Sequence, residues 1–138
     1  MRKTLITIVL LLTLTLSLCA CGGNSLEKAC KEADELVSQW HSEGYGGCIY
    51  KGEYIAEKDG FEVSMYMVYA RYPSSVDELD VGAGYVKNSI TNTLKDELYP
   101  QLVEVFEGEG VSIAFVLSDQ NGKNTWSTIL DGEVEYYD

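Results

Sequence analysis

The residues best suited to chemistry in this chain are four cysteines and a single histidine. Cys19 and Cys21 lie close together near the N-terminus, whereas Cys30 and Cys48 are well separated from them and from each other. A zinc site needs ligands at short spacings such as C-x-x-C or H-x-x-x-H, and the chain has neither. No G-x-S-x-G element or reactive-cysteine context accompanies His41, so it lacks a nucleophile to activate. The sequence predicts no metal site, no cofactor and no catalytic residue, and we expect a protein that is not an enzyme.

A second candidate for chemistry is the loop Asp119-Gln120-Asn121-Gly122-Lys123-Asn124, whose oxygen donors alternate as they do in calcium loops. A lysine inside the loop and the lack of a glutamate at its far end argue against calcium. An Asn-Gly pair also favours a type I′ hairpin turn, which explains the same residues without an ion.

The N-terminal segment has the three parts of an export signal. Arg2 and Lys3 precede an apolar and hydroxylated run from 4 to 18, and small residues and cysteines follow it. The run is shorter than the roughly 20 residues that a membrane-spanning helix needs. We therefore expect residues 1–20 to be a signal peptide that is removed.

The end of this segment, Leu18-Cys19-Ala20-Cys21, resembles the lipobox of bacterial lipoproteins. The resemblance implies that Cys21 receives a diacylglycerol and becomes the first mature residue after cleavage by signal peptidase II. Cys19 fits less well, because Leu18 would then stand where lipoproteins have Gly, Ala or Ser. A plain secretory signal with an incidental cysteine is the alternative. Two acyl chains anchor a protein stably, so the resemblance implies a lipid-anchored location on the extracytoplasmic side of the cell membrane.

The remaining 118 of the 138 residues suit a single domain over 21–138. Removing Arg2 and Lys3 with the signal changes the net charge from −12 to −14. Nucleic acid requires clusters of Lys and Arg, so this charge excludes it as a partner. An acidic surface instead attracts basic partners, or serves solubility alone.

Cys30 and Cys48 would be the two remaining thiols if Cys21 is acylated. An even number of cysteines in an exported protein suggests a disulfide. Closing this loop of about 18 residues would contribute on the order of 3 kcal/mol. Two buried thiols are the alternative.

Hydrophobic spacing predicts the elements. Apolar residues at intervals of three and four indicate helices over 25–41 and 85–107, the second interrupted near Tyr99 because Pro100 follows. Alternation predicts strands over 48–56, 61–72, 111–118 and 124–130, and an edge segment over 133–137. Asp59-Gly60 and Asn121-Gly122 mark hairpin turns. The order predicts an α+β two-layer sandwich: two helix-plus-hairpin units, packed as helices on one face of an antiparallel sheet.

The second strand has apolar residues on both of its faces. We expect its odd-numbered face, from Phe61 to Tyr69, to pack under the helices. The even-numbered face, with Tyr66 and Val68, would then lie open beside Val116 of the third strand. An open face is normally polar, so Tyr66, Val68 and Val116 are predicted binding residues for a protein, peptide or glycan. The alternative is that another segment covers this face.

The mature part resembles, in the order of its elements and its terminal Asn-Gly or Asp-Gly hairpin, short uncharacterised Firmicutes lipoprotein domains. This layout carries no functional residues with it. We therefore expect an anchored, non-catalytic binding module whose partners are the membrane, through its anchor, and a protein, peptide or glycan. The alternative is an acidic inhibitor or immunity-type protein that acts on a basic cell-surface enzyme.

Overall fold

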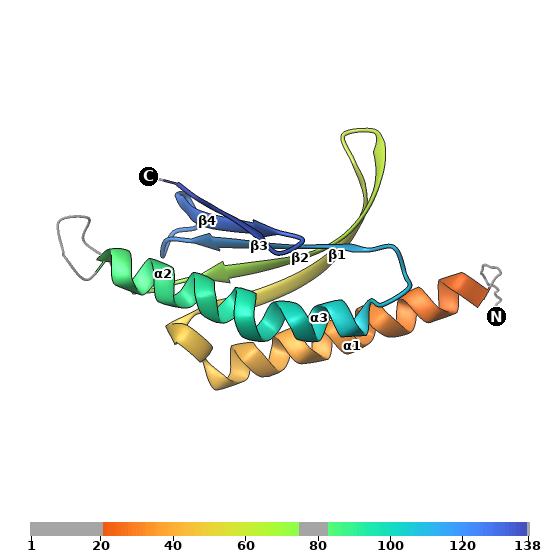
Figure 1. Ribbon diagram of the computed structural model, residues 1–138, viewed down its shortest axis with the longest axis horizontal. Helices are drawn as coiled ribbons and strands as arrows, with labels where there is room; N and C mark the ends of the chain where they lie inside the picture. Colours follow the sequence, from red (N-terminus) through yellow and green to blue (C-terminus); the bar gives the residue numbers. More distant parts are fainter. Residues whose placement is uncertain (1–20, 75–82, 138) are drawn as a thin grey trace.

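The computed structural model describes residues 21–74 and 83–137 (Figure 1). Its first element, α1 (Cys21–Glu43), includes the predicted helix and extends it at both ends. The buried stripe of Ala33, Val37 and Trp40 follows the helical spacing of three and four. Gly44 ends the helix with a positive φ of 65°, and its N–H bonds back to the carbonyls of Trp40 and His41.

A long hairpin follows α1 after a short 3₁₀ turn. Strands β1 (Ile49–Lys58) and β2 (Phe61–Arg71) pair antiparallel. Asp59 and Gly60 both have positive φ, 53° and 82°, as a type I′ turn requires. The Asp-Gly signal therefore correctly predicted this hairpin.

The second helical segment is continuous but irregular. It consists of α2 (Ala83–Thr93), a π-helical turn (Leu94–Leu98) and α3 (Tyr99–Val105). In the wider turn the N–H of Tyr99 bonds to the carbonyl of Leu94, five residues earlier. Pro100 has no N–H to give and would clash with a regular preceding turn. The break predicted near Tyr99 is confirmed, and its form is a π turn.

Three strands complete the sheet: β3 (Ser112–Ser118), β4 (Thr125–Leu130) and β5 (Glu133–Tyr136). The strand order is β1-β2-β3-β4-β5, and β2 and β3 run parallel. The α+β class is confirmed, but the expectation of a purely antiparallel sheet is wrong. The chain crosses over through α2 and α3 between β2 and β3, and a crossover connection brings two strands together in parallel.

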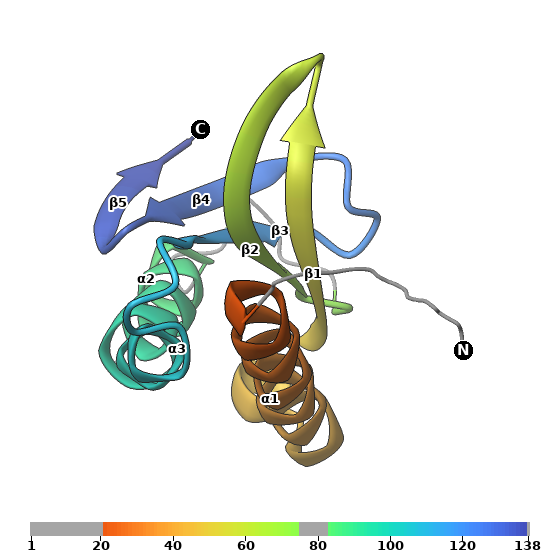
Figure 2. The ribbon, with the colours of Figure 1, turned by 90° about the vertical axis from the view of Figure 1, so that its right-hand side faces the viewer.

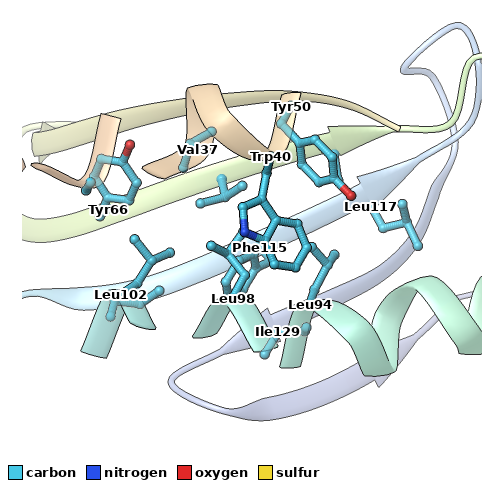
Figure 3. Packing of buried hydrophobic residues seen from close by; sticks show 14 of the residues in the cluster. Val37, Trp40, Tyr50, Tyr66, Leu94, Leu98, Leu102, Phe115, Leu117 and Ile129 are labelled. Atoms are coloured by element: carbon cyan, nitrogen blue, oxygen red, sulfur yellow. The ribbon is translucent and has the colours of Figure 1, made fainter. Parts of the chain in front are cut away.

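Both helical segments lie on the same side of the sheet in Figure 2, and the β1–β2 hairpin extends well beyond the other strands. Figure 3 shows Trp40 of α1 and Leu94 and Leu98 of the second segment converging on Phe115 of β3. A buried polar pair adds to this core. The hydroxyls of Thr91 and Ser127 are 2.8 Å apart, and Thr91 donates to the Lys87 carbonyl, so Ser127 is the donor to Thr91.

The even-numbered face of β2 is the one that the helices cover, which reverses the predicted orientation. Tyr66, Val68 and Ala70 are fully buried. Tyr66 donates a hydrogen bond of 2.6 Å from its hydroxyl to Asp34 of α1, and its ring packs 5.2 Å from that of Phe106. Asp34 belongs to α1 and Phe106 directly follows α3, so alternation within the strand could not have indicated these contacts.

Candidate functional site

The open face of the sheet contains an apolar hollow of about 450 Å³. The strand register pairs Met67 of β2 with Ala114 of β3, and Ala114 with Leu130 of β4, on this face. The β1–β2 hairpin forms one side of the hollow, with Ile55 and Lys58 of β1, and β5 borders the other side. Its apolar lining side chains include Ile55, Val63, Met65, Met67, Ala114, Val116 and Leu130.

Parts of this lining are in contact with solvent. Leu130 is 50% exposed and Tyr137, which borders the hollow, is 42% exposed. A contiguous apolar surface that remains exposed on a folded protein is typical of a binding site. The two methionines add adaptability, because their unbranched thioether side chains can repack around different shapes.

The polar groups of the site lie at its border. Lys58 stands on the hairpin side, and Glu133 and Glu135 stand on the β5 side. The hydroxyl of Thr128 is 3.3 Å from that of Tyr137, so these two groups bond to each other. Such an arrangement can hold an apolar group in the centre and a charged group at the rim.

The structure separates the three predicted binding residues. Val116 lies on the open face and lines the hollow, as predicted. The expectation that Tyr66 and Val68 lie there is wrong, because both face the helices and are completely buried. Burial first, and then the hydrogen bond to the Asp34 carboxylate, raises the pKa of the Tyr66 phenol. Tyr66 therefore joins α1 to the sheet.

Met65, Met67 and Leu130 were missed by the sequence analysis. The sequence predicted the odd-numbered face of β2 to lie in the core because that face is wholly apolar from Phe61 to Tyr69. Its two methionines were the available signal. Methionine specifies a fixed core poorly and is frequent at adaptable binding surfaces, whereas valine and alanine on the even-numbered face fit close packing against helices.

The predicted disulfide is not formed, and both Cys30 and Cys48 are free. Cys30 lies on α1 near Asp34 and Glu109, whereas Cys48 lies beyond the other end of that helix, where its thiol faces the Gly46 carbonyl. About 20 Å of helix separates Cys30 from the C-terminal end of α1, and a disulfide needs Cα atoms within about 7 Å. Burial raises the pKa of the Cys48 thiol to about 11, against a partial opposing effect of a hydrogen bond with Tyr50.

His41 has a structural contact. Its Nδ1 accepts a hydrogen bond of 3.2 Å from the backbone N–H of Tyr50, which ties the end of α1 to β1. In the described part of the chain, no three His, Cys, Asp or Glu side chains are grouped so that they could hold a metal ion.

The Asp119–Asn124 loop is organised by its own hydrogen bonds. The Asp119 carboxylate accepts from the backbone N–H groups of Lys123 and Asn124 and from the Asn124 side chain. Desolvation raises the pKa of Asp119, but these bonds outweigh it and hold the pKa below its usual value. Gly122 has a positive φ of 72° and Asn121 does not, so the predicted type I′ turn is wrong here. The Asp119 carboxylate instead caps a longer loop.

A second hollow, of about 730 Å³, lies between α3 and the β4–β5 turn. Its acidic side chains include Glu104 and Asp131, but the Asp131 carboxylate already accepts a hydrogen bond from the backbone N–H of Ile113. The open-face hollow is the better candidate site, because apolar side chains from four strands converge on it.

The predicted signal peptide, residues 1–20, lies outside the described residues. Cys21 is the first residue of α1, and its predicted lipidation stays a prediction. Within residues 21–74 and 83–137, no helix combines the length and the apolar character needed to cross a bilayer.

The comparisons with known proteins identify no relative. No protein-family model, curated protein or solved structure matches this chain.

Proposed function

We propose that this protein is a lipoprotein anchored to the cell membrane through Cys21, and that it acts outside the cytoplasm by binding rather than by catalysis. In this proposal residues 21–138 form one two-layer domain. Its helices cover one face of the sheet, and the other face receives a protein, peptide or glycan. The observation that carries the binding function is the exposed apolar hollow on the open face.

The anchor is supported by the lipobox resemblance at Leu18–Cys21. A tether at the first mature residue would leave the open face accessible, because α1 and the sheet face that it covers lie on the other side (Figure 2). Diacylation would hold the domain at the membrane without a spanning helix.

A non-catalytic role is supported by the structural contacts of the reactive side chains, which are hydrogen-bonded or buried. The imidazole of His41 and the phenol of Tyr66 both make hydrogen bonds between α1 and the sheet. The Cys48 thiol is buried, and its raised pKa keeps it protonated at neutral pH, which suppresses nucleophilic reactivity. The hollow, by contrast, presents side chains suited to contact alone.

Site-specific photocrosslinking in intact cells tests the binding face. We would introduce benzoylphenylalanine at Met67 or Val116 in the hollow, and at Glu35 on the exposed side of α1 as the matched control. Defined crosslinked products from the first two positions and not from Glu35 are expected. Equal products at all three positions, or none in the hollow, would refute binding at this face.

Mass spectrometry of the protein from its native membrane tests the anchor. A mature N-terminal Cys21 carrying a diacylglycerol is expected. An unmodified thiol or a retained signal would contradict the anchored location while leaving the crosslinking result to decide the binding role.

A further inference from the structure

We infer that the occupant of the open-face hollow is a cationic peptide segment of a partner protein, with a large apolar side chain in the hollow and a lysine or arginine beside it. This inference rests on the proposed binding function and specifies its ligand. It follows from the apolar side chains that line the hollow and from the charged side chains at its rim.

The centre of the hollow requires an apolar group. Its floor is built from Met67, Val116 and their neighbours, and its volume of about 450 Å³ falls within the range of ligand pockets. Large side chains that fill such a pocket supply most of the energy of many protein interfaces. One aromatic side chain would cover Leu130, which is half exposed without a ligand.

The rim selects the charge of the occupant. Glu133 and Glu135 project to the open face from β5, since they pair with Leu130 and Thr128 of β4, which line the hollow. Lys58 is the one basic residue that the described part of the chain contributes to the lining. The chain as a whole is also strongly acidic, with a net charge of −12. A basic residue next to the apolar side chain would meet the two carboxylates, and the overall field would steer it there.

The same features disfavour other occupants. A fatty acid or an anionic phospholipid would bring negative charge to a rim with two carboxylates and one ammonium group. A glycan would set its hydroxyl groups against the apolar side chains at the centre of the hollow, which offer them no hydrogen bond. A second copy of the chain would bring its own net negative charge to this surface.

Peptide binding to the full chain tests the inference. The protein, in the form that cells produce, is placed in nanodiscs of neutral phosphatidylcholine, with empty nanodiscs as the blank. The probe is a fluorescently labelled peptide, Gly-Ser-Lys-Trp-Lys-Ser-Gly, and binding is measured by fluorescence anisotropy. Replacing its tryptophan with alanine should weaken binding by roughly thirtyfold or more. Replacing both lysines with glutamate should abolish it.

Matched variants of the protein locate the site. The pair Glu133→Gln and Glu135→Gln should weaken binding roughly five- to tenfold, because two exposed ion pairs are lost, and should reduce its salt dependence. The control pair is Glu57→Gln and Glu62→Gln, register partners on the hairpin that change the net charge equally but do not line the hollow. The control should bind as the native protein does. Leu130→Gln, at an exposed position, should weaken binding without affecting folding.

Equal losses in the two glutamate pairs, or equal binding of the glutamate peptide, would overturn the inference. Binding of a labelled fatty acid or oligosaccharide in place of the peptide would assign the hollow to that ligand. A dimer that Leu130→Gln dissociates would assign it to a second copy. If the peptide fails while crosslinking at Met67 still gives a defined product, the proposed function stands and the cationic ligand is wrong. If both fail, both proposals fall.

Discussion

Replacing Gly52 with alanine should destabilise the protein, although alanine ordinarily stabilises a strand relative to glycine. A Cβ atom at Gly52 would stand 2.0 Å from the hydroxyl oxygen of Tyr66 and 2.7 Å from its Cζ. Both separations are far below van der Waals contact, so the Tyr66 side chain must move. Glycine at this position lets the phenol lie against the β1 backbone.

Tyr66 has little room to move. Its ring is fully buried, it packs against Phe106, and its hydroxyl bonds to Asp34. Overpacking of a core costs about 1–3 kcal/mol, and a lost hydrogen bond costs about 1 kcal/mol more. We therefore expect Gly52→Ala to lower the free energy of unfolding by about 2–4 kcal/mol, against a gain of about 0.5–1 kcal/mol for the same change at an unhindered strand position.

Urea unfolding followed by circular dichroism provides the measurement. Gly84→Ala serves as the control, because its Cβ would meet nothing within 4 Å and its backbone has no positive φ. It should leave stability unchanged or raise it. Combining Gly52→Ala with Tyr66→Phe removes the closest clashing atom, so the double variant should lose about 1 kcal/mol less than the sum of the single variants. A neutral or stabilising Gly52→Ala, or strict additivity with Tyr66→Phe, would refute the proposed contact.

Three further predictions concern pH, thiols and the buried polar pair. Burial and the Asp34 bond raise the pKa of Tyr66, so its contribution to stability is complete below about pH 10 and is lost as pH rises further. Tyr66→Phe should therefore flatten the alkaline decline of the unfolding free energy, and an unchanged slope would contradict this origin. At pH 8, iodoacetamide should modify Cys48 more slowly than the less buried Cys30, and both thiols should react faster in urea. Peptide mapping by mass spectrometry measures this order, and a native Cys30–Cys48 disulfide would overturn it. Thr91→Val should cost about 1–3 kcal/mol, because it leaves the buried Ser127 hydroxyl without its Thr91 partner, whereas Ser127→Ala should cost less, because the Thr91 hydroxyl still donates to the Lys87 carbonyl. The double variant should cost less than the sum of the two. If the loss in the double variant equals the sum of the losses in the two single variants, the two hydroxyls do not interact.

Much of the fold was readable from local signals. The apolar stripe of α1 and the alternation in each strand predicted the elements, because burial of one face imposes these periods. Pro100 predicted the irregular turn before it. Asp59-Gly60 fits a type I′ turn, but Asn121-Gly122 does not form one, because the Asp119 carboxylate organises that loop through bonds to residues further along.

The orientation of β2 was not readable, and the binding residues were misassigned for that reason. Its odd-numbered face is the more continuously apolar of the two, so a period of two favoured the wrong face for the core. The choice depends on Gly52, which makes room for Tyr66, and on Asp34, which receives its hydroxyl. Both residues lie outside β2, and their proximity to it exists only in the folded protein. Val116 was placed correctly because the third strand has its larger side chains, such as Phe115, on the other face.

The parallel β2–β3 pair also bears on how the chain reaches its folded state. Residues 65–71 of β2 each pair with a residue 47 positions later, as Met65 does with Ser112, whereas the other strand pairs are hairpins. Such distant pairing forms late, because a long stretch of chain must be closed first. Until β3 pairs with it, β2 therefore has one edge unpaired and stays exposed to misassembly.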